Sequence, residues 1–139
     1  MTLAEKHASL VEDHLLIENR QERLAAIVDR ARRRPGLSES ERNDGNRVPG
    51  CVSQVWVVAE LAQGRCEFRC DADGPLVKGL VAFLCELYSG ATPEEIVRDG
   101  GDPLAELGVL RDLTPTRQNG LAAVRARIQG FARSHSVAS

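Results

Sequence analysis

The sequence predicts an α+β fold, in which a small antiparallel sheet of about three strands carries helices on one face. Three observations support this prediction. Residues 2–34 have the spacing of amphipathic helix, residues 54–61 and 65–71 resemble strands, and residues 76–88 form an apolar helical stripe. Because the strands stand together between helices, the order is typical of an α+β protein. We expect the 139 residues to form one domain over 1–139.

The first 34 residues are predicted to be helical. Leu10, Leu24 and Ile27 belong to a set of apolar residues at mixed three- and four-residue spacing, as one buried helix face requires. The pattern is interrupted near Asn19, and the Pro35-Gly36 pair ends it.

The strand region follows a polar loop over residues 38–47. The run 54–61 is rich in valine, and residues 62–64 turn the chain. Residues 65–71 then alternate, with Cys66, Phe68 and Cys70 on one face and charged side chains on the other. This alternation predicts a half-buried strand with one wet face. We expect a third, short strand near 46–49.

Helix start signals recur in the second half of the chain. Asp73-Gly74-Pro75 precedes the apolar stripe, and Thr92 is a capping residue followed by proline. Asp102-Pro103 opens a further helix, and Thr114-Pro115 or Thr116 begins the last one. These signals predict a long helix, two short helices and a final helix that contains Leu121 and Val124 on its buried side.

Composition excludes several classes of function. The net charge is −2 and aromatic residues make up 4% of the chain, so we expect no nucleic-acid binding. Charged residues from Glu5 onward interrupt the N-terminus, which is atypical of a secretory signal, and no apolar run is long enough to span a membrane. We expect a cytoplasmic protein without membrane attachment, whose four cysteines are thiols rather than disulfides.

Cys51 is the main candidate for chemistry. It follows Val48-Pro49-Gly50, a turn signal, and stands immediately before the first strand run. A cysteine on a loop above a rigid sheet is placed to react with something outside the chain. A loop cysteine can equally pack against the sheet, and the local sequence leaves both interpretations open.

The remaining cysteines are predicted to be core residues. Cys66 and Cys70 are four residues apart on a strand, which separates them by roughly 13 Å, too far to share one metal ion without a sharp bend. Cys85 lies on the apolar helical stripe. The three histidines do not complete a ligand set, so we expect no structural metal.

Three stretches of the chain together resemble the SufE family of sulfur acceptors. They are Val48-Pro49-Gly50-Cys51-Val52-Ser53-Gln54-Val55-Trp56-Val57, the segment from Asp71-Ala72-Asp73 through Leu76-Val77-Lys78-Gly79 to Thr92-Pro93-Glu94-Glu95-Ile96, and Leu113-Thr114-Pro115-Thr116-Arg117-Gln118-Asn119-Gly120-Leu121. The resemblance covers most of the chain. It implies an α+β fold shared with the IscU-type scaffold proteins.

The resemblance implies that Cys51 takes a persulfide sulfur from a cysteine desulfurase and stimulates that enzyme. The sulfur then passes to an iron–sulfur scaffold complex. The chain itself would be an accessory protein rather than an enzyme, with no tightly bound cofactor beyond the transient persulfide, because pyridoxal phosphate belongs to the desulfurase. We expect a monomer or a homodimer.

Other residues match the family pattern around this cysteine. Arg117 would hold the cysteine loop or stabilise thiolate charge, although a surface ion pair is an equal alternative. Gly50, Gln54, Asp71 and Asp73 would contact the partner, and for the two aspartates turn formation and helix capping is an alternative of at least equal weight.

Three alternatives to a sulfur acceptor for cluster assembly remain open. They are a metal or cluster scaffold of the IscU type, a sulfur relay to another thiolation pathway, and a plain interaction module in which Cys51 is incidental. If Cys51 is an acceptor, we expect its thiol to be sheltered in the free protein by Val48, Val52 and the apolar helical stripe.

Overall fold

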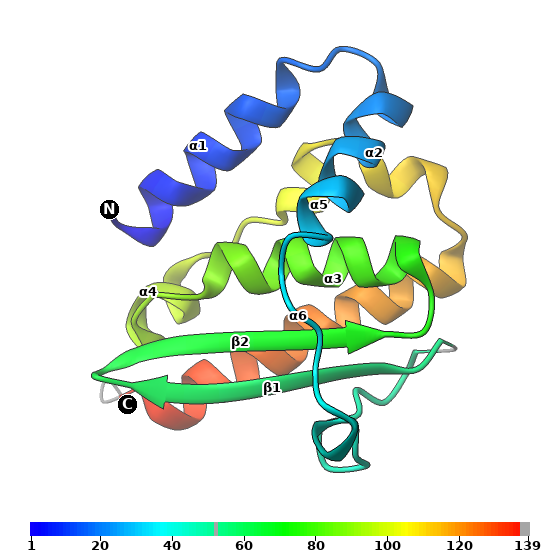
Figure 1. Ribbon diagram of the computed structural model, residues 1–139. Coiled ribbons are helices and arrows are strands. Elements are labelled where there is room, and N and C mark those ends of the chain that lie inside the picture. Colours follow the sequence, from blue (N-terminus) through cyan, green and yellow to red (C-terminus); the bar gives the residue numbers. More distant parts are fainter. Residues whose placement is uncertain (52, 137–139) are drawn as a thin grey trace.

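The structure is a computed structural model that describes residues 1–51 and 53–136 (Figure 1). Its elements, in chain order, are α1 (Leu3–Leu15), α2 (Arg20–Ala31), the 3-10 turn η1 (Glu39–Glu41), β1 (Val55–Ala62), β2 (Arg65–Ala72), α3 (Pro75–Tyr88), α4 (Pro93–Arg98), α5 (Pro103–Glu106), the 3-10 turn η2 (Val109–Asp112) and α6 (Pro115–His135). The predicted α+β class is confirmed.

β1 and β2 form an antiparallel hairpin, in register from Val55 opposite Ala72 to Ala62 opposite Arg65. The turn between them is Gln63-Gly64, and both residues have left-handed backbone angles (φ 54° and 79°). Two such residues make the tight turn whose twist matches that of paired strands. The hairpin therefore has little freedom to slip in register.

The two faces of the hairpin differ as the alternation predicted. Cys66 and Phe68 are buried on the inner face, where α3 packs against β2 and α6 packs against β1. On the outer face Val58 lies opposite Arg69, and Glu60 opposite Glu67. Figure 1 shows α3 and α6 on the same side of the hairpin.

The third predicted strand is reduced to one bridge. Arg47 pairs with Trp56, supported by hydrogen bonds from Val48 N–H to the Val55 carbonyl and from Val57 N–H to the Asn46 carbonyl, each 2.8 Å. Pro49 has no N–H to donate and Gly50 adopts φ 91°, so the chain turns away before a longer ladder can form. The sheet of the described residues has two strands rather than three.

Backbone groups on the edge of β2 that faces away from β1 are also paired. The Cys66 N–H donates to the Ala91 carbonyl and Gly90 N–H donates to the Cys66 carbonyl, each at 2.8 Å. The Phe68 N–H donates to the Ser89 hydroxyl at 3.0 Å. The segment that follows α3 therefore covers this edge.

The predicted helix boundaries are confirmed where capping residues define them. Asn19 separates α1 from α2 and accepts a hydrogen bond from the N–H of Glu22. Thr92 caps α4, and Thr114 caps α6 through the N–H of Arg117. Such side-chain caps satisfy backbone donors that the first helical turn leaves free.

The hydrophobic core lies between the hairpin and the helices and includes residues from Leu3 to Ala132. α2 packs closely on α3 at Gly79, where a β-carbon would lie only 2.8 Å from the Cα of Val28. Cys66 and Cys85 are fully buried and Cys70 is 7% exposed, which confirms their assignment to the core. Within the described residues, no helix is long and apolar enough to cross a membrane.

Candidate functional site at Cys51

Cys51 lies on the loop between the Arg47 bridge and β1, and this loop packs against α6. Gly50 adopts φ 91°, a conformation that side chains disfavour, and a β-carbon there would lie 3.6 Å from that of Ala123 on α6. The predicted position of Cys51 on a loop after a turn is confirmed. The glycine allows the chain to bend at the point where it approaches the helix.

The Cys51 thiol points toward α6 and contacts Gly120. Its Sγ donates a hydrogen bond to the Gly120 carbonyl oxygen at 3.4 Å. A β-carbon on Gly120 would lie 3.2 Å from Sγ, closer than such contacts normally are. The absence of a side chain at position 120 therefore creates the space that the thiol occupies.

Beside the thiol is a cavity of about 320 Å³. Most of its walls are apolar, and polar residues at the beginning of α6 complete it. The lining consists of Cys51, Ser53, Val55, Val77, Val81, Thr114, Thr116, Arg117, Gly120, Leu121 and Val124. The cavity therefore connects the Cys51 thiol with β1, α3 and α6.

A second, more open hollow of about 620 Å³ adjoins the same loop. It is lined by Asp44, Gly45, Arg47, Val48, Pro49, Gly50, Cys51 and Arg127. Cys51 lines both the cavity and this hollow, and it is half-buried. Of the two valines predicted to shelter the thiol, Val48 is 2% exposed and Val52 lies outside the described residues.

The local environment keeps Cys51 in its protonated form. Burial raises the pKa of the Cys51 thiol, because a thiolate is disfavoured away from water, and the positive charge of Arg47 opposes this effect. Arg47 was not singled out from the sequence. Its position four residues before Cys51 was the signal from which a charge close to the thiol could have been predicted.

Arg117 lines the cavity together with Cys51, which brings the two predicted residues to one site. It stands in the first turn of α6, where its backbone N–H donates a hydrogen bond to the Thr114 hydroxyl. The residue is exposed, and its guanidinium forms no hydrogen bond or ion pair within the described part of the chain. Among residues 1–51 and 53–136, the surface ion pair considered above as an alternative is not formed.

Gln54 and Asp73 lie at the open end of the hairpin, close to the cysteine loop. Both residues are exposed. The Asp73 N–H donates a hydrogen bond to the Gln54 carbonyl at 3.1 Å. This main-chain contact holds the beginning of β1 against the segment that follows β2. Both side chains belong to the accessible surface near Cys51.

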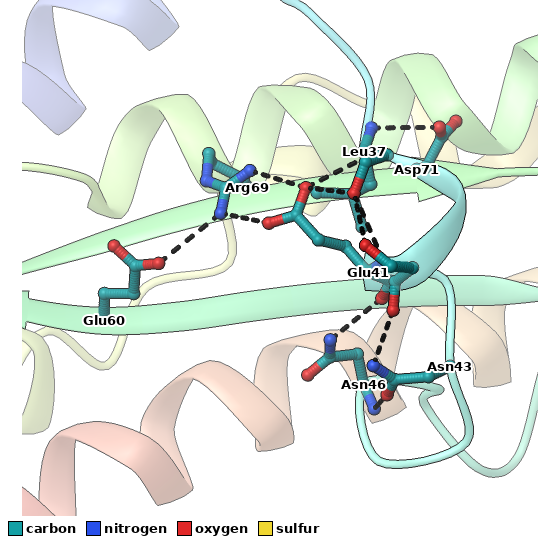
Figure 2. Close-up of polar contacts among 9 residues, drawn as sticks. Leu37, Glu41, Asn43, Asn46, Glu60, Arg69 and Asp71 are labelled. Carbon is teal, nitrogen blue, oxygen red and sulfur yellow. Dashed lines mark hydrogen bonds and ion pairs between the residues drawn. The ribbon is translucent and has the colours of Figure 1, made fainter.

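Asp71 is placed differently, beneath the segment that crosses the outer face of the hairpin (Figure 2). It is 6% exposed. Its carboxylate accepts hydrogen bonds from the N–H groups of Leu37 and Ala72, and it pairs with Arg42 at 3.2 Å and Lys78 at 3.4 Å. Burial alone would raise the pKa of Asp71, but the donors and Lys78 hold it below its ordinary value. These contacts anchor the segment before the cysteine loop.

A further ionic contact fastens the same segment. Figure 2 shows Arg69 of β2 between Glu41 of η1 and Glu60 of β1, with Arg69–Glu41 at 2.5 Å and Arg69–Glu60 at 3.4 Å. Asn46 continues the network by donating from its side chain to the Glu41 carbonyl at 2.8 Å. The polar loop predicted for 38–47 is thus tied to the outer face.

The other cysteines do not reach the site. Cys70 on β2 and Cys85 on α3 interact with each other through their thiols, which lowers the pKa of Cys70 and raises that of Cys85. Among the described residues, no three histidine, cysteine or acidic side chains gather closely enough to hold a metal ion.

These observations define a class of protein: an α+β domain that presents one half-buried cysteine between a hairpin and its last helix. The model of the SufE family, described as an Fe-S metabolism associated domain, matches residues 8–132. The chain belongs to the SufE family.

A solved structure supports the fold independently. It is the solution structure of a hypothetical protein from Thermus thermophilus, which is 22% identical in sequence and superimposes with a TM-score of 0.77. The match covers 94% of this chain and 95% of that one. At this identity the likeness concerns the fold.

Proposed function

We propose that Cys51 accepts sulfur from the persulfide of a cysteine desulfurase and delivers it for iron–sulfur cluster assembly. The observation that carries the proposal is the placement of Cys51. Of the four cysteines, all within the described residues, Cys51 is half-buried beside two hollows while the other three are buried in the core. Membership of a family associated with Fe-S metabolism supports this role.

The proposed step is an exchange between sulfur atoms. The Cys51 thiolate attacks the outer sulfur of the donor persulfide, a new S–S bond forms at Cys51, and the donor S–S bond breaks. The donor cysteine leaves as a thiolate and takes up a proton equivalent to the one that Cys51 lost. No external oxidant or reductant is required, since one S–S bond replaces another.

The apolar cavity suits both the resting thiol and its product. Because burial raises the pKa of Cys51, the free protein holds it as a thiol, which is a weak nucleophile. Docking that moves the loop away from α6 would return the pKa of Cys51 toward its ordinary value and so increase the fraction of thiolate where the donor lies. Once loaded, the outer sulfur fits a cavity of about 320 Å³ whose apolar walls limit its contact with water and other thiols.

Arg117 is the proposed charge partner of this reaction. Its guanidinium is free of partners within the described residues and lines the same cavity as Cys51. An arginine remains positive at all relevant pH values and offers five donors, so it can stabilise a thiolate or an outer persulfide sulfur. Arg117→Gln should slow transfer while leaving the fold intact.

The proposed docking surface surrounds the loop and includes Gly50, Gln54 and Asp73, which are exposed near Cys51. Asp71 is left out of it, because its carboxylate is engaged inside the chain. Removal of the persulfide would free the desulfurase for another cycle, so the protein should stimulate that enzyme. Pyridoxal phosphate would remain with the desulfurase, and an iron–sulfur scaffold complex would receive the sulfur in the cytoplasm.

The direct test is to incubate the protein with a cysteine desulfurase and free cysteine, then to record intact mass and peptide maps without reductant. We expect a gain of about one sulfur atom on the peptide that contains Cys51. Desulfurase turnover should rise in the same mixture.

Two variants make the test specific. Cys51→Ser should abolish both the mass gain and the stimulation, whereas Cys66→Ala removes a buried thiol and should retain both if the protein folds. Unmodified Cys51 with unchanged desulfurase turnover would contradict the proposal. Iron or zinc retained through purification and dependent on Cys51 would instead favour a scaffold.

A further inference from the structure

The loop that carries Cys51 is held from two sides. On one side the bridge between Arg47 and Trp56 ties its base to β1. On the other side Arg127 of α6 reaches across the second hollow and donates from Nη2 to the Gly45 carbonyl at 2.7 Å and from Nη1 to the Arg47 carbonyl at 3.3 Å. Arg127 therefore connects the base of the loop to the helix that contacts the thiol.

The residues of α6 that contact the loop lie on one face of the helix. Gly120, Ala123 and Arg127 are separated by three and four positions, the spacing that places side chains above one another. Gly120 faces Cys51 and Ala123 faces Gly50, so small residues stand where the loop is nearest. The long side chain of Arg127 bridges the distance where the loop moves away.

The contact at the loop tip is weak by comparison. A thiol is a poor hydrogen-bond donor, and the Cys51–Gly120 contact is 3.4 Å long. Hydrogen bonds from a guanidinium are stronger because the donor is charged. The bridge to β1 fixes the base of the loop to the strand, but it does not set the distance of the loop from α6.

We propose that Arg127 is a positioning residue that holds the cysteine loop against α6 and so limits the exposure of the Cys51 thiol in the free protein. Arg127 acts through the loop backbone and does not touch the reacting sulfur. The inference rests on the proposed function for its purpose, since a sulfur acceptor benefits from a thiol that is exposed only at its partner.

The test measures the alkylation rate of Cys51 by iodoacetamide across pH, with peptide mapping and without a desulfurase. Arg127→Ala should raise this rate about fivefold, the effect expected when one charge-assisted hydrogen bond is lost. The midpoint of the pH profile should move to lower pH, because an exposed thiol loses the burial that raises its pKa. Arg127→Lys keeps the charge but only part of the contact, and should give a smaller increase.

Arg133→Ala is the matched control. Arg133 is an exposed arginine on the same helix, and its side chain forms no contact to the loop among the described residues. This variant should have the wild-type rate and pH profile. Circular dichroism should show that all three variants are folded.

A wild-type rate and midpoint in folded Arg127→Ala would overturn the inference. If Arg127→Ala does not fold, Arg127→Lys decides, and an unchanged rate in that variant would overturn it. Persulfide transfer to the wild-type protein is measured in parallel. Because alkylation needs no desulfurase, failure of transfer contradicts the proposed function alone, whereas unchanged alkylation contradicts the role of Arg127 alone.

Discussion

The carbonyl oxygen of Gly120 accepts a hydrogen bond from the thiol of Cys51, which stands 69 residues earlier in the chain. The contact brings together a glycine in the first half of the last helix and the cysteine of the loop before β1. Its geometry depends on hydrogen as the side chain of residue 120, because a β-carbon there would come within 3.2 Å of Sγ. The position of the thiol therefore depends on a residue that carries no functional group.

Substitution of Gly120 should change both the free energy of unfolding and the position of the Cys51 thiol. Alanine is favoured over glycine inside a helix by about 0.5–1 kcal/mol. Gly130→Ala, in the same helix and with open space around its β-carbon, should gain that amount in the free energy of unfolding. Gly120→Ala should gain less and should raise the alkylation rate of Cys51, because the methyl group displaces the thiol. Equal stability gains with unchanged alkylation would show that the contact is unimportant.

Gly79 should tolerate no side chain. A β-carbon there would lie 2.8 Å from the backbone of Val28, so α2 and α3 would have to move apart. We expect Gly79→Ala to lower the free energy of unfolding by about 1–3 kcal/mol, despite the better helix propensity of alanine. Urea denaturation of this variant beside Gly130→Ala provides the comparison, and an increase in both variants would refute the close approach.

His7 should make stability depend on pH. Its ring nitrogens contact Asp99 at 3.0 Å and Glu106 at 2.6 Å. Burial opposes the charge, yet the two carboxylates raise the pKa of His7 above its ordinary value. A raised pKa contributes stability that is complete below the unfolded value of 6.5 and is lost as pH rises through the folded value.

The comparison for His7 is urea denaturation of wild type and His7→Gln at about pH 6 and about pH 9. At the lower pH the free energy of unfolding of wild type should exceed that of His7→Gln by on the order of 1 kcal/mol, after allowance for solvent around Glu106. This difference between the two proteins should shrink at the higher pH. His135→Gln is the control, because it removes an exposed histidine that has no carboxylate partner among the described residues. A difference that is constant with pH would exclude this role.

Asp71 should contribute to folding rather than to docking. Asp71→Asn replaces an acceptor that binds two backbone N–H groups and two cations, and should cost about 1–3 kcal/mol of unfolding free energy. Since the pKa of Asp71 is lowered in the folded protein, its contribution is present above the unfolded pKa and is lost as pH falls through the folded pKa. Asp73→Asn, at an exposed position, should be nearly neutral. Similar stabilities of the two variants would argue against the buried anchor.

The sequence was sufficient for features that depend on neighbouring residues. The caps at Asn19, Thr92 and Thr114 use hydrogen bonds to residues three positions ahead, so their signals are local. The alternation around Phe68 likewise predicted which face of β2 is buried. The turn at Gly50 placed Cys51 on a loop.

Contacts between distant residues were not predictable in this way. Arg127 reaches Gly45, 82 residues away, and nothing near either residue indicates the pairing. Asp71 was assigned to a wet face by alternation, but the segment that covers it comes from residues 37–42, which pack there only once the chain has folded. The third strand was overestimated because Pro49 and Gly50 stop the ladder after one bridge.

The short backbone pairings on both sides of the hairpin have a consequence for self-association. A two-stranded sheet would leave two rows of free N–H and carbonyl groups, which can recruit strands of other chains. Residues 89–91 occupy part of the β2 edge, and residues 46–48 occupy part of the β1 edge. Since residues 46–48 also lead to Cys51, a partner that lifted only the loop tip would leave the β1 edge protected. A partner that also broke the pairing of residues 46–48 with β1 would expose that edge to strands of other chains.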